Sequence, residues 1–217
     1  QYSGNSDVYT HKSNEIISFS HRPLIEFGAE TFIRYNEAIS ILRKVKKFKE
    51  ISFSKIVSHR KPYGLASNFK QFKEGAKVGL VTIYGNKIIG HLEVVPTCVK
   101  ENQDLLKYKI FISYAYGMGD NYPVQVINKP FIGEPNSCCT ETYLQIGAWD
   151  KKSIALNVMS YMKSKLFRFL VLLIKNTQHA TSKVYQFVPM QDFSKPWVDE
   201  ELYKKYNLTK DEIAFIE

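Results

Sequence analysis

The segment from residue 152 to residue 175 most constrains how this chain of 217 residues can fold. Apolar residues recur there at helical spacing, which predicts one long helix. They cover more than one face, so we expect the helix to be buried on several sides. Its most apolar stretch, residues 169–174, is far too short to cross a bilayer. The apolar positions are Ile154, Leu156, Val158, Met159, Met162, Leu166, Phe169, Leu170 and Leu173.

Strand patterns lie on both sides of this segment. Residues 79–84 and 87–92 flank Gly85-Asn86, a turn signal that predicts a hairpin. Residues 107–114 alternate as in a half-buried strand. Further strands are predicted at residues 124–127, 131–132, 140–146 and 184–188, and a weak N-terminal hairpin at residues 7–10 and 16–19.

Helices are predicted to flank the β region. They cover residues 30–45, a short stretch at 53–58 and two short segments in the tail. Asp199 is expected to cap the helix over residues 200–206, and Thr209 with Glu212 has a capping-box pattern. The predicted fold is therefore α+β: a mixed, mostly antiparallel β region with a long packed helix and flanking helices.

The charge and the aromatic content of the chain narrow the range of partners that it can have. The chain has a formal net charge of +9 and contains 14 Tyr and 14 Phe. A basic surface favours a polyanion, either nucleic acid or an anionic membrane. Tyr suits a wet recognition surface because its flat ring ends in a polar group. No predicted helix has the lysine-rich amphipathic face of a membrane-surface helix, so we expect a nucleic-acid partner and no membrane.

The cysteines and the start of the chain indicate a cellular compartment. Cys98, Cys138 and Cys139 show neither a CxxC pair nor Cys/His ligand spacing, so the sequence predicts no metal site. Their odd number and the missing signal peptide favour reduced thiols in a cytoplasmic protein. Because the chain begins with Gln1 and ends inside a predicted helix, we expect a piece of a longer protein.

Motifs for methyl transfer and for DNA cleavage are weak in this sequence. A methyltransferase needs a glycine-rich strand-to-helix turn and an Asn/Asp-Pro-Pro-aromatic loop. The isolated glycines of residues 117–119 are the nearest approach to the first, and the second is missing. A metal-dependent nuclease needs clustered carboxylates with a lysine. Residues 150–152 and 200–204 are loose candidates, and both have the pattern of solvated helix ends.

A cysteine–histidine pair is the other catalytic arrangement to weigh. Cys138 or Cys139 could pair with His91 or His179, although burial as a small apolar side chain is the commoner use of cysteine. The remaining histidines, expected on the surface or in local packing, are His11, His21 and His59. The sequence thus predicts no catalytic residue and favours a binding module over an enzyme.

Four stretches in the second half of the chain carry a family resemblance. They are Asn-Lys-Pro-Phe-Ile-Gly-Glu-Pro-Asn-Ser-Cys-Cys-Thr-Glu-Thr-Tyr-Leu at 128–144, Ser-Tyr-Met-Lys-Ser-Lys-Leu-Phe-Arg-Phe-Leu at 160–170, Lys-Asn-Thr-Gln-His at 175–179 and Tyr-Gln-Phe-Val-Pro-Met-Gln-Asp-Phe at 185–193. They resemble the C-terminal target-recognition part of adenine-specific DNA methyltransferases from type II restriction-modification systems. The resemblance extends to residues 32–36, 58–65 and 197–217. The order of elements is also similar to the recognition domains of type I specificity subunits.

This resemblance implies that DNA recognition and catalysis belong to different domains of the parent protein. The loop-rich β region would read double-stranded DNA, and the helix would pack against a neighbouring helix or domain. The catalytic domain, with its S-adenosylmethionine, would lie upstream, so no cofactor is expected in this chain. Residues 1–28 would be the tail of that methyltransferase domain, 29–58 a helical connector, 59–195 the recognition domain and 196–217 a C-terminal helical tail. A dimer through the long helix, and an endonuclease in the parent protein, are left open.

Three loop regions carry the residue types that bind DNA. Lys and Arg neutralise phosphates, whereas polar side chains such as Gln bond base edges. The alternatives are a solvated loop, a tight turn and a helix C-cap. The predicted DNA-binding residues are Arg60, Lys61, Tyr63, Asn68, Lys70 and Lys73 in the first region, Tyr114, Tyr116 and Asn121 in the second, and Asn176, Thr177, Gln178 and His179 in the third.

Two other functions stay open at this point. One is a metal-dependent nuclease domain of a restriction enzyme, which a cleavage assay with magnesium would reveal. The other is a general single-strand or RNA-binding module that stacks bases on Tyr and Phe. A competition between duplex and single-stranded DNA distinguishes that module from a duplex reader.

Overall fold

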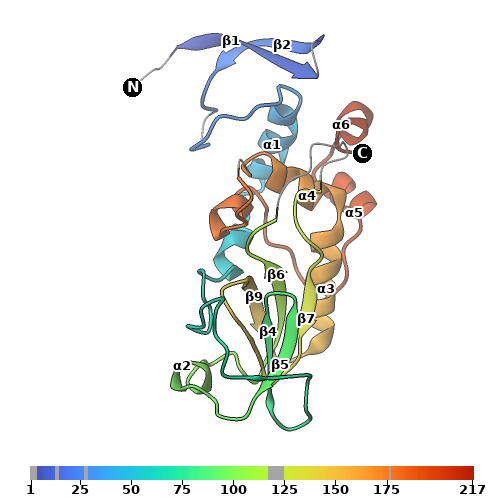
Figure 1. Ribbon diagram of the computed structural model, residues 1–217. Coiled ribbons are helices and arrows are strands. Elements are labelled where there is room, and N and C mark those ends of the chain that lie inside the picture. Colours follow the sequence, from blue (N-terminus) through green and yellow to red (C-terminus); the bar gives the residue numbers. More distant parts are fainter. Residues whose placement is uncertain (1–3, 13–14, 27–28, 117–124, 176) are drawn as a thin grey trace.

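The computed structural model of the protein describes residues 4–12, 15–26, 29–116, 125–175 and 177–217 (Figure 1). An N-terminal hairpin lies at one end of the molecule, helices follow it, and the two larger sheets lie at the other end. The strands are β1 (Asn5–Lys12), β2 (Glu15–Pro23), β3 (Lys73–Glu74), β4 (Val81–Gly85), β5 (Ile88–Leu92), β6 (Tyr108–Ser113), β7 (Phe131–Gly133), β8 (Ser137–Cys139) and β9 (Tyr143–Trp149). The helices are α1 (Ala38–Lys47), α2 (Thr97–Lys100), α3 (Lys152–Lys163), α4 (Lys165–Leu172), α5 (Asp199–Lys205) and α6 (Lys210–Ile216), with 3-10 helices η1 (Phe53–Ile56) and η2 (Ser182–Tyr185). The predicted α+β class is confirmed.

The strands form three sheets, and their pairing is mostly antiparallel. The sheet orders are β1-β2, β3-β5-β4-β8 and β7-β6-β9, and β4 pairs with β8 in parallel. The predicted β4–β5 hairpin is confirmed, but Gly85 pairs with Ile88, so the turn is Asn86-Lys87 rather than Gly85-Asn86. This register keeps Val81, Ile83 and Gly85 together on the buried face of β4.

Three of the predicted strands differ from the structure. Residues 125–127 form no strand, and Val124 lies outside the described residues. The segment 140–146 begins with a turn, in which the Tyr143 N–H donates to the Thr140 carbonyl (3.1 Å), and β9 starts only at Tyr143. The segment 184–188 opens within η2 instead of forming a strand. Val184 and Val188 are buried in the core although they do not lie in a strand. Their β-branched side chains therefore gave a misleading prediction of a strand.

The predicted long helix is broken in two at Ser164. This residue has extended backbone angles, and its hydroxyl accepts the Phe167 N–H at 3.2 Å, as an N-cap of α4 does. The Asp199 carboxylate accepts the N–H groups of Lys165 (2.9 Å) and Leu166 (3.0 Å). Asp199 therefore caps α4 rather than its own helix α5, which corrects the prediction. The break lets α3 pack against β6 and β9 while α4 packs against α5 and α6.

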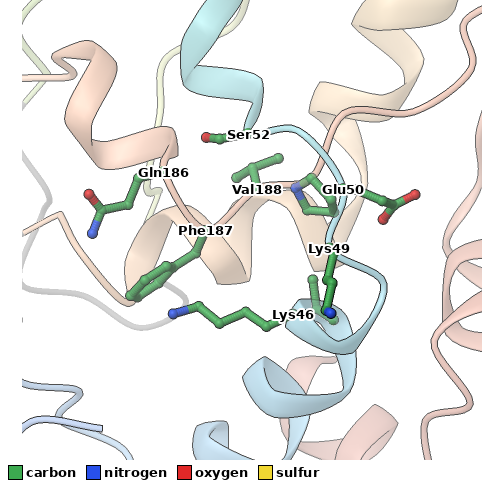
Figure 2. A pocket seen from close by; sticks show the side chains of 9 residues that line it. Lys46, Lys49, Glu50, Ser52, Gln186, Phe187 and Val188 are labelled. Atoms are coloured by element: carbon green, nitrogen blue, oxygen red, sulfur yellow. The ribbon is translucent and has the colours of Figure 1, made fainter. Parts of the chain in front are cut away.

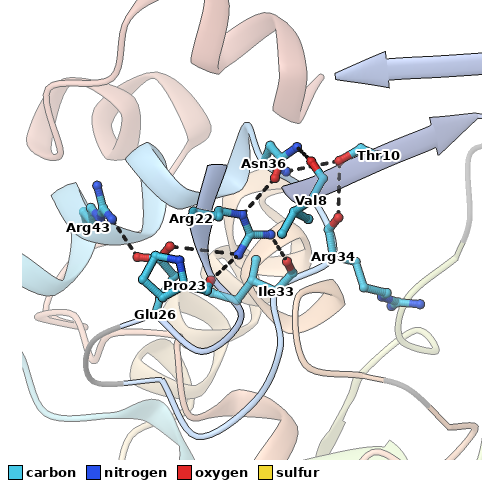
Figure 3. A network of polar contacts seen from close by, with 9 residues as sticks. All are labelled: Val8, Thr10, Arg22, Pro23, Glu26, Ile33, Arg34, Asn36 and Arg43. Atoms are coloured by element: carbon cyan, nitrogen blue, oxygen red, sulfur yellow. Dashed lines mark hydrogen bonds and ion pairs between the residues drawn. The ribbon is translucent and has the colours of Figure 1, made fainter. Parts of the chain in front are cut away.

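A polar network shortens the helix predicted at residues 30–45, because α1 begins only at Ala38 (Figure 3). The buried Arg22 of β2 donates to the Ile33 carbonyl (2.6 Å) and to the Asn36 side chain (2.8 Å). Asn36 in turn donates to the Val8 carbonyl of β1 (2.9 Å). Residues 33–36 thus form hydrogen bonds with the hairpin. These tertiary bonds override the local helix propensity.

The interior contains two apolar clusters that meet at β6. Ile110 and Ile112 belong to the larger cluster, with α1, α3 and α4. Phe111 belongs to the smaller one, with Ile83 and Cys138. Residues 109–112 are all buried, so β6 is covered on both faces rather than on one as predicted. In the tail, the capping box of Thr209 and Glu212 is confirmed.

Candidate nucleic-acid interface

Two of the three predicted DNA-binding regions lie side by side in the structure. Residues 114–116 leave the end of β6 and run antiparallel to residues 178–180. The Tyr116 N–H donates to the Gln178 carbonyl and the Ala180 N–H donates to the Tyr114 carbonyl, each at 2.8 Å. This backbone pairing holds together two segments that lie more than sixty positions apart in the sequence.

The first predicted region, which contains Arg60, reaches the same place through that residue. Its guanidinium carbon lies 4.9 Å from the centroid of the Tyr114 ring. The Tyr114 ring stacks on His179 with centroids 4.9 Å apart and an interplanar angle of 28°. We call these three residues the Arg60 ladder. A guanidinium over an aromatic face is attracted by the ring quadrupole, so the stacking orients the Arg60 side chain.

A single carboxylate, Glu141, holds the base of the first loop. Its oxygens lie 3.1 Å from Arg60 Nε and 3.6 Å from Lys61 Nζ, and they accept the Ser67 N–H at 3.0 Å. The hydrogen bond from Ser67, together with Arg60 and Lys61, holds the pKa of Glu141 below its ordinary value. The Arg60 side chain is 57% exposed and that of Lys61 46%, so both cations remain open to a ligand.

A buried lysine supports the second loop. Lys175 Nζ donates to the Tyr116 carbonyl at 3.1 Å and lies 5.9 Å from the Tyr116 ring centroid. Burial lowers the pKa of Lys175. The Tyr116 hydroxyl donates to the Gln125 side chain at 2.8 Å. Lys175 and Glu141 both lie in stretches that carry the family resemblance, but the sequence analysis predicted neither of them as a binding residue.

The remaining predicted residues are distributed differently. Tyr63, expected on the surface loop, is only 1% exposed, and its hydroxyl donates to Gln145 at 2.6 Å, so that assignment is corrected. Asn68 and Lys70 are exposed before β3, and Lys73 pairs with Glu93 (2.8 Å) in a sheet separate from the ladder. Thr177 and Gln178 are exposed next to His179. Asn121 and Asn176 lie outside the described residues, as do the glycines of residues 117–119.

A second group of polar side chains lies in the interior, where Lys109 Nζ donates to the carbonyls of Leu105 (2.9 Å) and Ser137 (3.0 Å). Gln145 accepts from Tyr63 and donates to Asp104 (2.8 Å). We call Tyr63, Lys109 and Gln145 the buried polar cluster, and the partly exposed Asp104 lies at its edge. Burial lowers the pKa of Lys109 to about 8, despite the opposing effects of Cys138 and Asp104.

The structure also shows the side chains of the two catalytic alternatives, the cysteine–histidine pair and the nuclease carboxylates. Cys138 and Cys139 are buried, and burial raises the pKa of Cys138 to about 12, which disfavours a thiolate. His91 donates its Nδ1–H to the Gly75 carbonyl at 2.6 Å. Among the carboxylates, Glu201 pairs with Lys195 at 2.7 Å. Within the described ranges, no three His, Cys, Asp or Glu side chains gather into a group that could hold a metal ion.

A pocket of about 170 Å³ lies between the end of α1 and residues 186–189 (Figure 2). The Lys46 side chain extends toward the Phe187 ring, and its Nζ lies 4.5 Å from the ring centroid. Burial lowers the pKa of Lys46. No sequence motif pointed to this pocket, because its walls come from two distant segments.

Comparison of the chain with models of known protein families and with curated proteins found no match. Among the residues that the structure describes, no helix combines the length and apolar character that crossing a membrane requires.

Proposed function

We propose that this chain is a sequence-specific recognition domain for double-stranded DNA, belonging to a restriction-modification adenine methyltransferase. It would position target DNA for a methyltransferase domain of the same protein, where S-adenosylmethionine would bind. In this proposal the chain itself performs no chemistry. Its partners are duplex DNA and the catalytic domain, which would extract the target adenine from the helix.

One observation carries the proposal: three loops that sequence reasoning singled out separately converge on the Arg60 ladder. Arg60, Tyr114 and His179 come from distant parts of the chain, and exposed Lys61, Thr177 and Gln178 lie next to them in sequence. Such a surface combines cations for phosphates with polar groups for base edges. Loops on a packed sheet and helix scaffold are where binding residues concentrate.

The ladder favours a duplex over an unpaired strand. A single-strand binder needs free aromatic faces on which successive bases can stack. The Tyr114 ring is already in contact with Arg60 and His179. The Tyr116 hydroxyl is bonded to Gln125, and its ring lies near Lys175. These rings act as supports for charged and polar neighbours, which suits the reading of a groove.

The test is a binding competition with the 217-residue chain. Labelled duplex is bound, and duplex or single-stranded DNA of random sequence competes at several salt concentrations. We expect duplex to compete better and affinity to fall steeply with salt. The double variant Arg60→Gln/Lys61→Gln should lose affinity, whereas the matched control Lys204→Gln/Lys210→Gln, on the distant tail, should lose much less. Equal competition by single strands, or equal loss in both variants, would overturn the proposal.

A magnesium cleavage assay in the same experiment addresses the nuclease alternative. The chain is incubated with supercoiled plasmid and magnesium, and the Glu200→Gln/Glu201→Gln variant serves as the comparison. We expect no nicking by either protein. Nicking by the unmodified chain that disappears in the variant would replace the proposed function with a nuclease.

A further inference from the structure

We infer that Arg60 reads a guanine in the major groove and that Glu141 is its positioning residue. The inference rests on the proposed function and adds the base that this part of the surface recognises. It follows from the position of Glu141 beside the Arg60 Nε atom and from the exposure of the Arg60 side chain.

The Arg60 side chain is more than half exposed to solvent. The Nε atom faces Glu141 at 3.1 Å, and the side chain is 57% exposed. In the described part of the chain, no hydrogen bond to the terminal nitrogens Nη1 and Nη2 is seen, although the Tyr114 ring lies 4.9 Å from the guanidinium carbon. These two nitrogens form a planar fork of donors. The fork matches the O6 and N7 acceptors of guanine, which is the commonest specific arginine contact in the major groove.

The fork is held before any ligand arrives. Tyr114 supports the guanidinium and is itself backed by His179. Glu141 is fixed in turn, because its side chain accepts the Ser67 N–H and its backbone N–H donates to the Leu65 carbonyl at 2.8 Å. An arginine that is ordered in the free protein loses less conformational freedom on binding, so more of its interaction energy is available for discrimination.

Glu141 also distinguishes a base contact from a phosphate contact. Its carboxylate lies beside both Arg60 and Lys61, so the local formal charge of the three side chains is +1 rather than +2. This carboxylate weakens the attraction between Arg60 and a phosphate at short range. The guanine edge is neutral and offers acceptors only, so its contact with the fork does not depend on that attraction.

The first experiment selects bound sequences from a random duplex pool. We expect the unmodified chain to enrich a motif with a guanine at one position whose preference disappears in Arg60→Gln. The preference should be roughly 5- to 150-fold. The matched control is Arg43→Gln, since Arg43 is also exposed and paired with a carboxylate, Glu26. This control should retain the whole motif.

Base analogues then test the contact atom by atom. At the selected position, 7-deazaguanine lacks the N7 acceptor and should weaken binding of the unmodified chain, while Arg60→Gln should not respond. Inosine keeps O6 and N7 and loses only the minor-groove amine, so it should bind about as guanine does. If both analogues bind as guanine does, or if Arg60→Gln weakens all sequences equally, Arg60 is no guanine reader.

Two variants of Glu141 test its positioning role. Glu141→Gln keeps an acceptor for Ser67 but loses the charge, so it should lose guanine preference while gaining affinity for unrelated duplex. Glu141→Asp keeps the charge but withdraws the carboxylate from Arg60, so it should lose preference with an unchanged salt dependence. Glu134→Gln, which frees Lys152 elsewhere, should gain nonspecific affinity only. A purely structural role would lower the melting temperature and weaken all DNA alike.

The outcomes separate the inference from the proposed function. If the unmodified chain enriches no duplex motif, the proposed function fails. If it enriches a motif that both Arg60→Gln and Glu141→Gln retain, duplex recognition stands and the guanine inference fails. In the Arg60→Gln background, Glu141→Gln should cause no further loss of preference, because Glu141 acts through Arg60.

Discussion

The loop of residues 58–65 connects two polar regions whose donors are used in opposite ways. In the buried polar cluster, the Tyr63 hydroxyl bonds Gln145, and the Lys109 ammonium bonds two backbone carbonyls. In the Arg60 ladder, only three positions earlier in the chain, the side chain is 57% exposed, and within the described residues no hydrogen bond to its terminal nitrogens is seen. Both regions combine charge with aromatic rings. The use of the hydrogen-bond donors therefore separates a structural polar cluster from a surface suited to a ligand.

The largest expected effect tests the structural side of this comparison. Tyr63→Ala removes a buried ring and should lower the free energy of unfolding by about 3–5 kcal/mol. Tyr63→Phe keeps the ring and loses only the hydroxyl bonded to Gln145, so about 1 kcal/mol is expected. Urea unfolding followed by circular dichroism measures both. A negligible loss in Tyr63→Ala would contradict the placement of Tyr63 in the core.

The next effect tests the binding side. Arg60→Gln should weaken binding to the selected duplex roughly tenfold or more, while changing stability by less than about 0.5 kcal/mol, as is usual at exposed sites. Fluorescence anisotropy and urea unfolding measure the two quantities on the same samples. The comparison breaks down if Arg60→Gln destabilises the fold. It also breaks down if Tyr63→Phe weakens duplex binding as much as Arg60→Gln does.

The pH dependence of stability sharpens the contrast between the buried Lys109 and the exposed Arg60. Below pH 8 Lys109 is charged in the folded and the unfolded chain, so the cost of burying its ammonium is fully present. Between that pH and its ordinary value of 10.5, the folded chain releases the proton first. The unfolded state then binds more protons, so stability rises with pH, by about 1–2 kcal/mol between pH 7 and 9.

The measurement is the unfolding free energy of the native chain relative to Lys109→Met at each pH. This difference removes the opposing ionisation of buried thiols, which both proteins share. Parallel pH profiles of the two proteins would show that Lys109 is charged to the same extent in both states.

The smallest effect concerns the support beneath Arg60. Tyr114→Leu keeps apolar bulk but removes the aromatic face, so it should cost about 0.5–1 kcal/mol in binding to the selected duplex, a few-fold in affinity. Isothermal titration against that duplex measures it, with Tyr9→Leu on the outer face of the hairpin as the control. Equal affinities of Tyr114→Leu and the unmodified chain would show that the Tyr114 ring does not support Arg60 in binding.

Local signals in the sequence predicted several elements well. The β4–β5 hairpin, the N-terminal hairpin, β6 and the capping box of Thr209 and Glu212 depend on neighbours within a few positions, and all are present. The same local reasoning failed where distant groups decide. Ser164 ends α3 because Asp199, far along the chain, accepts two N–H groups of α4. Residues 33–36 avoid the helix because Arg22 and the hairpin bond their polar groups.

The candidate site shows the same division. Composition and loop chemistry were sufficient to select Arg60, Tyr114 and His179 as residues that could face a nucleic acid. Nothing in their spacing predicted that they stack on one another, or that Glu141 would join Arg60 to Ser67. Tyr63 looked like its neighbours in the loop, yet it is buried, because loop direction is set by the packing of Tyr63 against Phe111 and its bond to Gln145.

By itself, the sequence determined the α+β class, the basic and aromatic character of the chain and the identity of its polar loops, because these depend on composition and short-range periodicity. Only the tertiary structure decided which cations are buried and which are open, where the long apolar segment breaks, and which loops meet. These features depend on burial and on hydrogen bonds between residues far apart in the chain, whose energies no local pattern contains.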